Sequence, residues 1–437
     1  MDGVQEQAFT AAENGNIEEI QEIVDSGENI LKFKNSNKNL LHVASEKGHE
    51  KLVSFLLDQG FDIEETTSDY DGYRPLHLAT RKGHVNTVEI LLTRGANINA
   101  KDQYQATALH KACRALYIDI IRILISKGVD LNVGDNNEWT PLHRACAAGR
   151  IDIVHLLVEN GANIESVDVN GATCLHVASD AGRKEVVEYL LEEKAIVCAK
   201  DNLQLTPLSR AAKRGKTEVI MLLINKDSSC LLMVDKLGRT CLHLAAEEGH
   251  HGVVELLIEN TEINLETVNK KGFTALHSAI EAGHLEIVKL LVRKGASMCH
   301  RAVQSPLFLC CKDTGNRVLN DQRVAILHFL LQNGADISLQ NSEKLQPLHF
   351  AAQNGVLEMV ECLVKVGKAD VNVTANGKKA VDYALPFKVD IANFLQNPEL
   401  HKTPMEMNNA TPNQVDVENA ETLKVKKKVS SKFCVMS

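Results

Sequence analysis

A four-residue pattern recurs along most of this 437-residue chain at a nearly constant spacing. Its fullest form is Thr140-Pro141-Leu142-His143. The fourth position holds histidine in eight copies, at His42, His77, His110, His143, His176, His243, His277 and His349. Ser209, Phe308 and Asp382 replace it in three further copies, and a degenerate first copy lies near Phe9. About twelve copies of a ~33-residue unit favour a stack in which neighbouring units bury each other's apolar faces.

The residues of one unit predict two short helices. Thr140 is a suitable N-cap for a helix that Pro141 begins, because the first helical residue leaves its N–H unused and proline has none. Gly149 and Gly161 are suited to end the first and the second helix. Within the second helix, the apolar residues of 151–157 recur at helical spacing.

The ~33-residue period and the signature Thr-Pro-Leu-His-x-Ala resemble those of the ankyrin repeat family over roughly residues 5–397. The resemblance implies an all-α repeat solenoid in which each unit contributes a hairpin and two antiparallel helices. We expect an N-terminal capping repeat at 1–37, internal repeats at 38–377 and a C-terminal capping repeat at 378–397. The terminal copies are more polar than the internal ones, which suits outer faces that meet water.

One step of the repeat is longer than the others. The interval from Phe308 to His349 is 41 residues, so about eight extra residues are expected in Lys312–Arg323, as a loop between that unit's two helices. Insertions in repeat proteins often fall on one face. Both a solvated loop and a partner contact remain open for this insertion.

The resemblance implies that recognition uses the hairpin tips and the inner helix face. Rings then lie at or near the tips, at Tyr70, Tyr73, Tyr104, Trp139 and Phe273. Basic side chains lie on the first helices, at Arg81, Lys82, Lys111, Arg114, Arg144, Arg210, Lys213 and Arg214, and are followed by Glu247, Glu248 and Glu281. Aromatic residues and arginine are frequent hot spots. The predicted partner-binding set is therefore Tyr73, Tyr104, Trp139, Lys111, Arg114, Arg144, Arg210 and Arg214.

The basic strip predicts a protein partner with an acidic, extended segment. Charge reversal of Arg144 and Arg210 is then expected to slow association and to reduce its salt dependence. Two other interpretations stay open: each ring packs on its own hairpin, and the basic side chains line a solvated helix face without a ligand.

The sequence offers no catalytic or metal-binding constellation, and we expect neither an enzyme nor a cofactor. The regularly spaced histidines are expected to be structural and to tie each hairpin to the next unit. Cys299-His300 and Cys310-Cys311 do not have the spacing of zinc ligands. Arg214-Gly215-Lys216-Thr217 lacks the earlier glycine of a phosphate loop. The net charge of −9 does not indicate nucleic-acid binding, and a monomer is expected.

The sequence also bears on the compartment. No stretch approaches the ~18 consecutive apolar residues of a transmembrane helix. The N-terminal residues lack the basic and apolar regions of a signal peptide. We therefore expect the chain in a reducing cytosol, with its 11 cysteines as free thiols.

The composition changes after Asn397. Residues 398–423 predict a disordered acidic linker, and residues 424–437 are polybasic, with Lys424, Lys426, Lys427, Lys428 and Lys432. The sequence ends in Cys434-Val435-Met436-Ser437, which matches a prenylation box that favours farnesylation of Cys434 by a prenyltransferase. One lipid chain binds membranes only marginally, and the lysines are expected to add attraction to an anionic membrane surface.

These features predict a protein-binding scaffold or adaptor that is cytoplasmic and peripheral on the cytosolic face of a membrane. Ser430 and Ser431 lie inside the basic run, and their phosphorylation is expected to weaken the attraction. The tail is also compatible with a nuclear-import or solubility patch and a fortuitous cysteine. In that case the chain is a soluble cytosolic or nuclear regulator that masks a partner through its groove.

Overall fold

The unit around Thr140 folds as its sequence predicts. Helix α9 (Pro141–Ala148) begins after Thr140, whose side-chain oxygen accepts the backbone N–H of His143. It ends at Gly149, which has a φ of 80°. Glycine adopts this left-handed conformation without a steric penalty from Cβ. Helix α10 (Ile151–Glu159) follows and packs back against α9.

A computed structural model describes residues 3–299, 305–384 and 388–398, and helix pairs of this kind follow one another along them. The other α-helices are α1 (Gly3–Asn14), α2 (Ile17–Asp25), α3 (Leu40–Lys47), α4 (Glu50–Asp58), α5 (Pro75–Lys82), α6 (Val85–Thr93), α7 (Ala108–Ala115), α8 (Ile118–Ser126), α11 (Cys174–Ala181), α12 (Lys184–Glu192), α13 (Pro207–Lys213), α14 (Thr217–Lys226), α15 (Cys241–Glu247), α16 (His251–Asn260), α17 (Ala275–Ala282), α18 (Leu285–Arg293), α19 (Pro306–Cys310), α20 (Arg317–Gln332), α21 (Pro347–Asn354), α22 (Leu357–Lys365), α23 (Ala380–Tyr383) and α24 (Val389–Gln396). Two 3₁₀ helices, η1 (Ile30–Lys32) and η2 (Ser228–Leu232), lie in loops, and β1 (Thr374–Ala375) pairs antiparallel with β2 (Lys378–Lys379).

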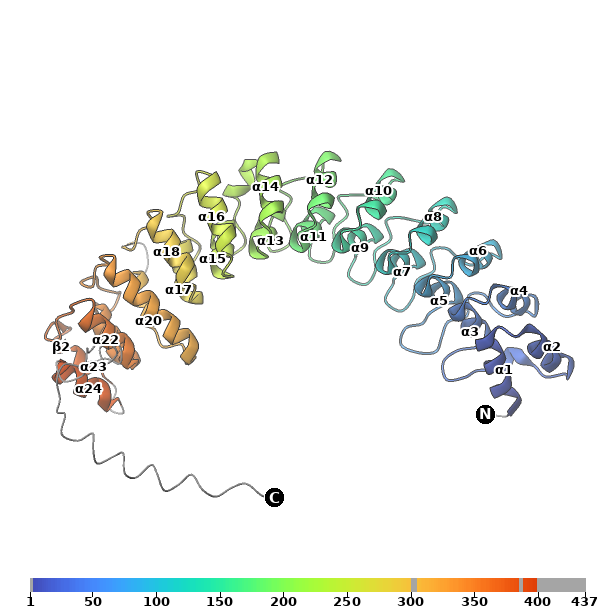
Figure 1. Cartoon of the computed structure of the whole chain (residues 1–437), viewed down its shortest axis with the longest axis horizontal. Helices are drawn as coiled ribbons and strands as arrows, with labels where there is room; N and C mark the ends of the chain where they lie inside the picture. Colours follow the sequence, from blue (N-terminus) through green and yellow to red (C-terminus); the bar gives the residue numbers. More distant parts are fainter. Residues whose placement is uncertain (1–2, 300–304, 385–387, 399–437) are drawn as a thin grey trace, which may run out of the picture.

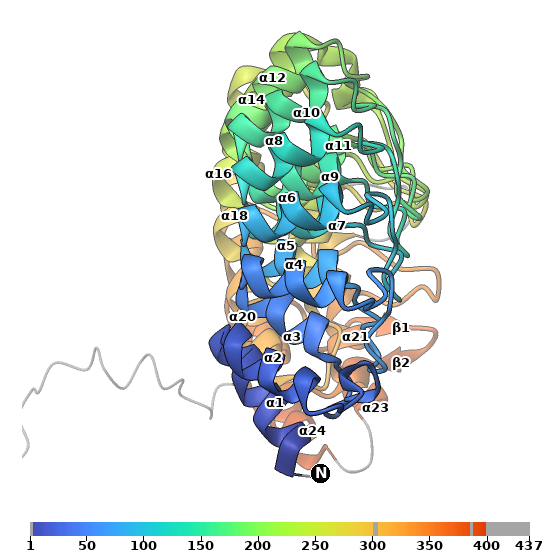
Figure 2. The same cartoon turned by 90° about the vertical axis from the view of Figure 1, so that its right-hand side faces the viewer.

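The helix pairs stack side by side into an arc (Figure 1). The odd-numbered helices α3 to α17 line the inside of the arc, and their even-numbered partners α4 to α18 lie outside. The hairpins project along one edge (Figure 2). The fold is therefore the all-α repeat solenoid that the sequence predicts.

The core runs as one continuous cluster of buried apolar residues from Ala8 to Leu395. In the α9–α10 unit its fully buried members include Leu142, Ala145, Ile153 and Leu157. Each layer between neighbouring units is thin, so small and branched side chains fill it. This explains how a chain with only 4% aromatic residues buries a large core.

The prediction of a loop at Lys312–Arg323 is wrong for residues 317–323, which are helical. Helix α20 begins at Arg317 and has 16 residues, whereas the outer helices before it have 9 or 10. The side chain of Asn316 accepts the backbone N–H of Leu319 and caps this extra length. Arg323 is buried, and its guanidinium donates to the carbonyls of Glu281 and Lys312 at 2.7 and 3.3 Å. The inserted residues therefore extend the outer helix instead of forming a solvated loop.

Seven signature histidines tie their unit to the next one, as predicted. In His143, Nδ1 accepts the backbone N–H of Thr140 at 3.1 Å, so the ring proton lies on Nε2, which donates to the carbonyl of Ala172 at 3.2 Å. The same Nε2 contact to the following hairpin joins His42 to Glu65, His77 to Ala100, His110 to Trp139, His176 to Leu205, His243 to Phe273 and His349 to Val373.

The hairpin tips are also joined along the array. At seven hairpins a backbone N–H near the tip donates to a carbonyl of the preceding tip: Ser68 to Asn37, Gln103 to Asp71, Asn136 to Tyr104, Val169 to Asn137, Asn202 to Asn170, Lys236 to Leu203 and Lys270 to Leu237. Exposed hairpins are thereby held in register by backbone groups, whatever side chains they carry.

The expectation that all 11 cysteines are free thiols is wrong for Cys198 and Cys230, which form a disulfide. They are 32 residues apart, about one repeat, so stacking brings their Cα atoms to 5.5 Å, an ordinary separation for a disulfide. Seven other described cysteines are buried thiols, and burial raises the pKa of Cys241 and Cys310 to about 12.

Among the helices of the described ranges, none combines the length and apolar character that a membrane span requires.

The histidine ties predict a pH-dependent stability. Burial lowers the pKa of His77 and His176 from 6.5 to about 4. The unfolded chain therefore binds protons that the folded array excludes, and the unfolding free energy falls as the pH drops from about 6.5 to 4. Each of these two histidines then removes about 3 kcal/mol. We expect the urea midpoint, followed by circular dichroism, to decrease over this range.

A His176→Asn variant separates this effect from the titration of carboxylates. It removes one tie, so it is less stable at pH 7, and it also removes one titrating ring. Its stability should fall less steeply between pH 7 and pH 4 than that of the original chain. An identical slope in the two proteins contradicts the assignment.

Candidate protein-binding groove

A pocket of about 320 Å³ is lined by residues of the hairpins and of helices α7 and α9. Both helices lie on the inside of the arc (Figure 1). The pocket brings together five of the eight predicted partner-binding residues, namely Tyr73, Tyr104, Lys111, Arg114 and Arg144. Trp139 lies next to it, with the Arg144 guanidinium 4.7 Å from the ring centroid. Arg210 and Arg214 lie two units further along, at helix α13.

The rings of this site divide into packed and exposed ones. Tyr73 is buried, with the Lys111 ammonium 4.8 Å from its centroid. Trp139 is half-buried and donates its Nε1–H to the Asp168 carboxylate at 3.1 Å. Tyr104 is 50% exposed and forms a free edge of the pocket. Packing within the array thus accounts for Tyr73 and Trp139, and it leaves Tyr104 available to a ligand.

Most of the predicted basic strip is neutralised inside the protein. Lys111, Arg144 and Arg210 form ion pairs with buried aspartates, with Asp102, Asp135 and Asp201 respectively. Each aspartate also closes its hairpin: Oδ1 of Asp135 accepts the backbone N–H groups of Asn137 and Trp139. Burial alone raises the pKa of Asp135, but the Arg144 guanidinium and these N–H groups outweigh it and lower that pKa.

These aspartates are the residues that the sequence prediction missed. Each stands five residues before the first residue of the signature, as Asp135 stands before Thr140. An aspartate recurs in that column, and in three units a basic residue follows it nine positions later. This pattern could have predicted the ion pairs. The consequence is a correction: charge reversal of Arg144 or Arg210 does not report on binding alone, because it places a second carboxylate beside a buried one.

Arg114 differs from the other basic residues of the pocket. It is exposed on α7, and among the residues that the structure describes it has no acidic side chain within 4.0 Å. Asp71, at the opposite hairpin, lines the same pocket and raises the pKa of the Tyr104 phenol. Once the pair of Arg144 with Asp135 and the pair of Lys111 with Asp102 are set aside, the pocket presents the Arg114 cation, the Asp71 carboxylate and the exposed ring of Tyr104.

The predicted charge change further along the array is only partly present. Arg214 pairs with Asp180, Glu247 with Arg239, and Glu248 with Lys213, the last at 3.8 Å. All six side chains are partly or largely exposed, so the pairs contribute little to stability. They do reduce the net charge that a partner would meet on α13 and α15.

Other predicted residues fall outside the described ranges. These are the lipidation residue Cys434, the lysines Lys424, Lys426, Lys427, Lys428 and Lys432, and the two serines Ser430 and Ser431. Within the described ranges, Cys198, Asp227 and Cys230 lie close enough to share a metal ion. The two sulfur atoms are joined as a disulfide and supply no thiolate, so the group is not a metal site in this state.

The ion pair of Arg144 predicts a stability effect. An Arg144→Glu variant brings a carboxylate to Asp135, whose side chain is 6% exposed. We expect it to lower the unfolding free energy by at least about 2 kcal/mol in urea titrations. Arg114→Glu, on the exposed and unpaired residue, is the matched control and should stay within about 0.5 kcal/mol of the original chain. Equal stability of the two variants contradicts the pairing.

Comparison with known families matches the chain to Ankyrin repeats (3 copies) over residues 8–102, 100–168, 134–201, 164–233, 208–302 and 307–405. No relative was found among the curated proteins compared with it. The matched segments together span most of the chain and coincide with the stacked helix pairs and hairpins of the arc. The chain therefore belongs to the ankyrin repeat family.

Proposed function

We propose that this protein is an adaptor whose ankyrin groove binds a protein partner and whose lipidated tail holds it at a membrane. Ankyrin repeats are protein-binding modules and are typically non-catalytic. The observation that carries the binding site is the pocket with Arg114 unpaired on its wall and Tyr104 half-exposed at its edge.

The charges of the pocket define the segment that it would accept. Lys111 and Arg144 are balanced by aspartates of the array, which leaves Arg114 to receive an acidic side chain. The ring of Tyr104 provides apolar contact beside it, and Asp71 can accept hydrogen bonds from the backbone of an extended chain. The proposed partner therefore presents an extended segment in which one acidic residue contacts Arg114. The segment need not be acidic along its whole length.

The proposal for the tail rests on two adjacent signals in the sequence. Cys434 is the fourth residue from the carboxyl end, in the pattern of a farnesylation box, and five lysines precede it within 424–432. A single prenyl chain gives reversible binding. Each lysine near an anionic leaflet adds about 1 kcal/mol, so five lysines supply the second signal that stable attachment requires.

The groove is tested by labelling of neighbouring proteins in cells that express the full chain fused to a labelling enzyme. Arg114→Glu should remove the direct partner from the labelled set, and the purified partner should associate at least about tenfold more slowly with this variant. Arg122→Glu is the control, because Arg122 is exposed on the outer helix α8 of the same unit. A partner lost equally from both variants, or from neither, excludes this pocket.

The tail is tested by cell fractionation and intact-mass measurement. The proposal expects the last three residues to be absent, a farnesyl group to be present on Cys434, and Cys434→Ser to move the protein from the membrane fraction to the soluble fraction. If Cys434→Ser leaves the distribution unchanged, the chain is instead a soluble regulator that masks its partner.

The same fractionation tests the two serines in the basic run. Ser430→Glu with Ser431→Glu adds two negative charges among the lysines, which should reduce the membrane fraction several-fold. Ser430→Ala with Ser431→Ala keeps the charge and should retain the original distribution. Equal retention of both pairs of variants rules out an electrostatic switch at these positions.

A further inference from the structure

A hydrogen bond recurs in the loops that precede the hairpins. A side chain in the loop before one hairpin accepts the backbone N–H of a residue in the loop before the next hairpin. In three units this acceptor lies three residues before the aspartate of the hairpin, as Asn132 lies before Asp135. These bonds join Glu64 to Asn97, Asn99 to Asp130, Asn132 to Asn163, Glu165 to Ile196 and Glu266 to Ser297, with donor–acceptor distances of 2.7 to 3.0 Å. Together with the signature histidine, this loop bond is a second tie between neighbouring units.

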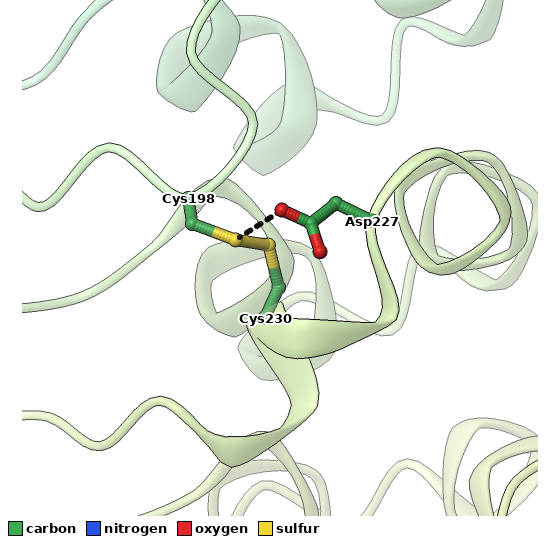
Figure 3. A group of neighbouring side chains, drawn as sticks. All are labelled: Cys198, Asp227 and Cys230. Atoms are coloured by element: carbon green, nitrogen blue, oxygen red, sulfur yellow. Dashed lines mark hydrogen bonds between the residues drawn. A yellow bond between two sulfur atoms is a disulfide. The ribbon is translucent and has the colours of Figure 1, made fainter.

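The disulfide lies where this loop bond would otherwise be. Cys198 occupies the acceptor's position, three residues before its aspartate, and Cys230 occupies the donor's position, five residues before the next one. The bond between them joins the loop before α13 to the loop before α15, as Figure 3 shows. A covalent link thus replaces a hydrogen bond at the junction of the α13–α14 and α15–α16 units.

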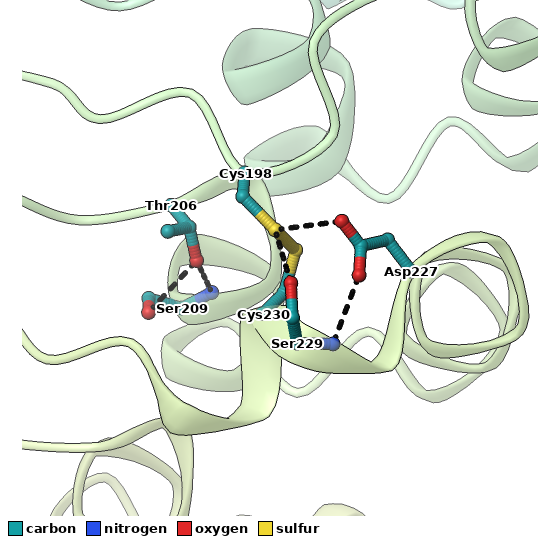
Figure 4. The surroundings of a disulfide bond; sticks show 6 residues. All are labelled: Cys198, Thr206, Ser209, Asp227, Ser229 and Cys230. Atoms are coloured by element: carbon teal, nitrogen blue, oxygen red, sulfur yellow. Dashed lines mark hydrogen bonds between the residues drawn. A yellow bond between two sulfur atoms is a disulfide. The ribbon is translucent and has the colours of Figure 1, made fainter.

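The same junction also lacks its histidine tie. Ser209 stands in the signature column of α13, and its hydroxyl pairs with Thr206 of its own unit at 3.1 Å (Figure 4). Among the junctions between inner helices from α3 to α17, this is the one where the structure describes neither a histidine bond nor a loop hydrogen bond. Other polar ties across this junction are the tip bond from Lys236 to Leu203, the bond from His250 to the carbonyl of Lys213, and the exposed ion pair of Lys213 with Glu248 at 3.8 Å.

We propose that Cys198 and Cys230 form a redox-controlled joint in the middle of the array. When the disulfide is present, it takes the place of both missing ties. When it is reduced, this junction becomes the weakest one in the α3–α17 stack. In the cytosolic location that the proposed function assigns, disulfides are characteristically transient and redox-sensing. The buried thiols of Cys241 and Cys310 are inert, because burial raises their pKa.

The chemistry is thiol–disulfide exchange with a low-molecular-weight thiol of the glutathione class. One thiolate attacks a sulfur of the pair, the Cys198–Cys230 bond breaks, and a mixed disulfide forms with release of the other cysteine. A second thiolate attacks the mixed disulfide and releases the second cysteine. In total, two thiols become one small disulfide, and two electrons and two protons pass to the protein. Cys198 is half-buried and Cys230 is buried, so Cys198 is the accessible sulfur.

Two polar groups lie within hydrogen-bonding distance of Cys198 once it is reduced. Its sulfur lies 3.5 Å from the Asp227 carboxylate and 3.7 Å from the Ser229 hydroxyl. A disulfide sulfur carries no proton, so the contact to Asp227 becomes an S–H···O hydrogen bond only after reduction. Hydrogen bonds from Ser229 lower the pKa of Asp227, which keeps this acceptor ionised. After reduction, the covalent link across the junction is therefore replaced by a weak S–H···O hydrogen bond from Cys198 to Asp227, in the loop that contains η2.

The position of the joint gives it a consequence for the groove. The pocket with Arg114 lies on the N-terminal side of the junction, and the acidic side chains Glu247 and Glu248 lie just beyond it, at the C-terminal end of α15. The next junction, from α15 to α17, also lacks the loop bond, because the acceptor's position holds Leu232, which is 82% exposed. Reduction therefore loosens the connection between two stretches of the concave face.

The test measures backbone hydrogen exchange by mass spectrometry on the full chain. The chain is either oxidised with glutathione disulfide or reduced with a phosphine, and a chelator is present throughout so that no metal bridges the thiols. Reduction should speed exchange at least about tenfold in residues 226–239 and leave α7 to α9 unchanged. A Cys230→Ser variant should exchange fast under both conditions.

A second variant tests the role of the missing histidine bond and leaves both cysteines unchanged. Ser209→His restores the missing tie toward the carbonyl of Arg239, the counterpart of the Leu205 carbonyl that His176 contacts. In this variant the effect of reduction should shrink to a few-fold. The proposal is overturned if no peptide linked through Cys198 and Cys230 forms on oxidation. It is also overturned if exchange is equal in both states, or if Ser209→His responds like the original chain.

Discussion

The array depends on a neutral imidazole that recurs in most of its units. In His143 the ring accepts a backbone N–H at the start of its own helix and donates to a carbonyl of the next hairpin. Both backbone groups are buried, and each would cost free energy if it were left unpaired. Because one rigid ring satisfies both, it fixes the position of the next hairpin relative to the helix. The unit-to-unit geometry follows from that bond, and the stability of the stack is close to a sum over neighbours.

A second column of residues couples stability to the surface that a partner meets. In Asp135 one carboxylate oxygen closes the hairpin and the other holds Arg144 on the concave face. The array therefore uses most of its concave cations for its own folding. A groove that looks basic in the sequence therefore has little excess positive charge in the structure. Recognition of an acidic partner then depends on Arg114, which these ion pairs do not include.

The period, the cap at Thr140 and the histidine ties were predictable because each depends on residues within one unit or at a fixed offset of one repeat. The helical start of the insertion at Arg317 was not expected, because its cap, Asn316, is a single residue without a repeated counterpart. The pairing of Cys198 with Cys230 depends on which loop positions touch across a junction, and spacing alone does not show it. The pocket residues were predicted as a group, but their ion pairs with Asp102 and Asp135 required side-chain positions.

An array of this kind transmits geometry only through its junctions. A small change of angle at one junction displaces every unit beyond it, although each unit keeps its own core. The junction between α13 and α15 has neither the histidine of the signature nor the loop hydrogen bond, so its angle is held by fewer directional bonds than at its neighbours. A covalent bond at that point has a larger effect on the shape of the arc than the same bond at a junction with both ties. Ser209 and the cysteine pair are for this reason best understood together. At this junction the array has lost the histidine bond and has gained a disulfide, which reduction can break.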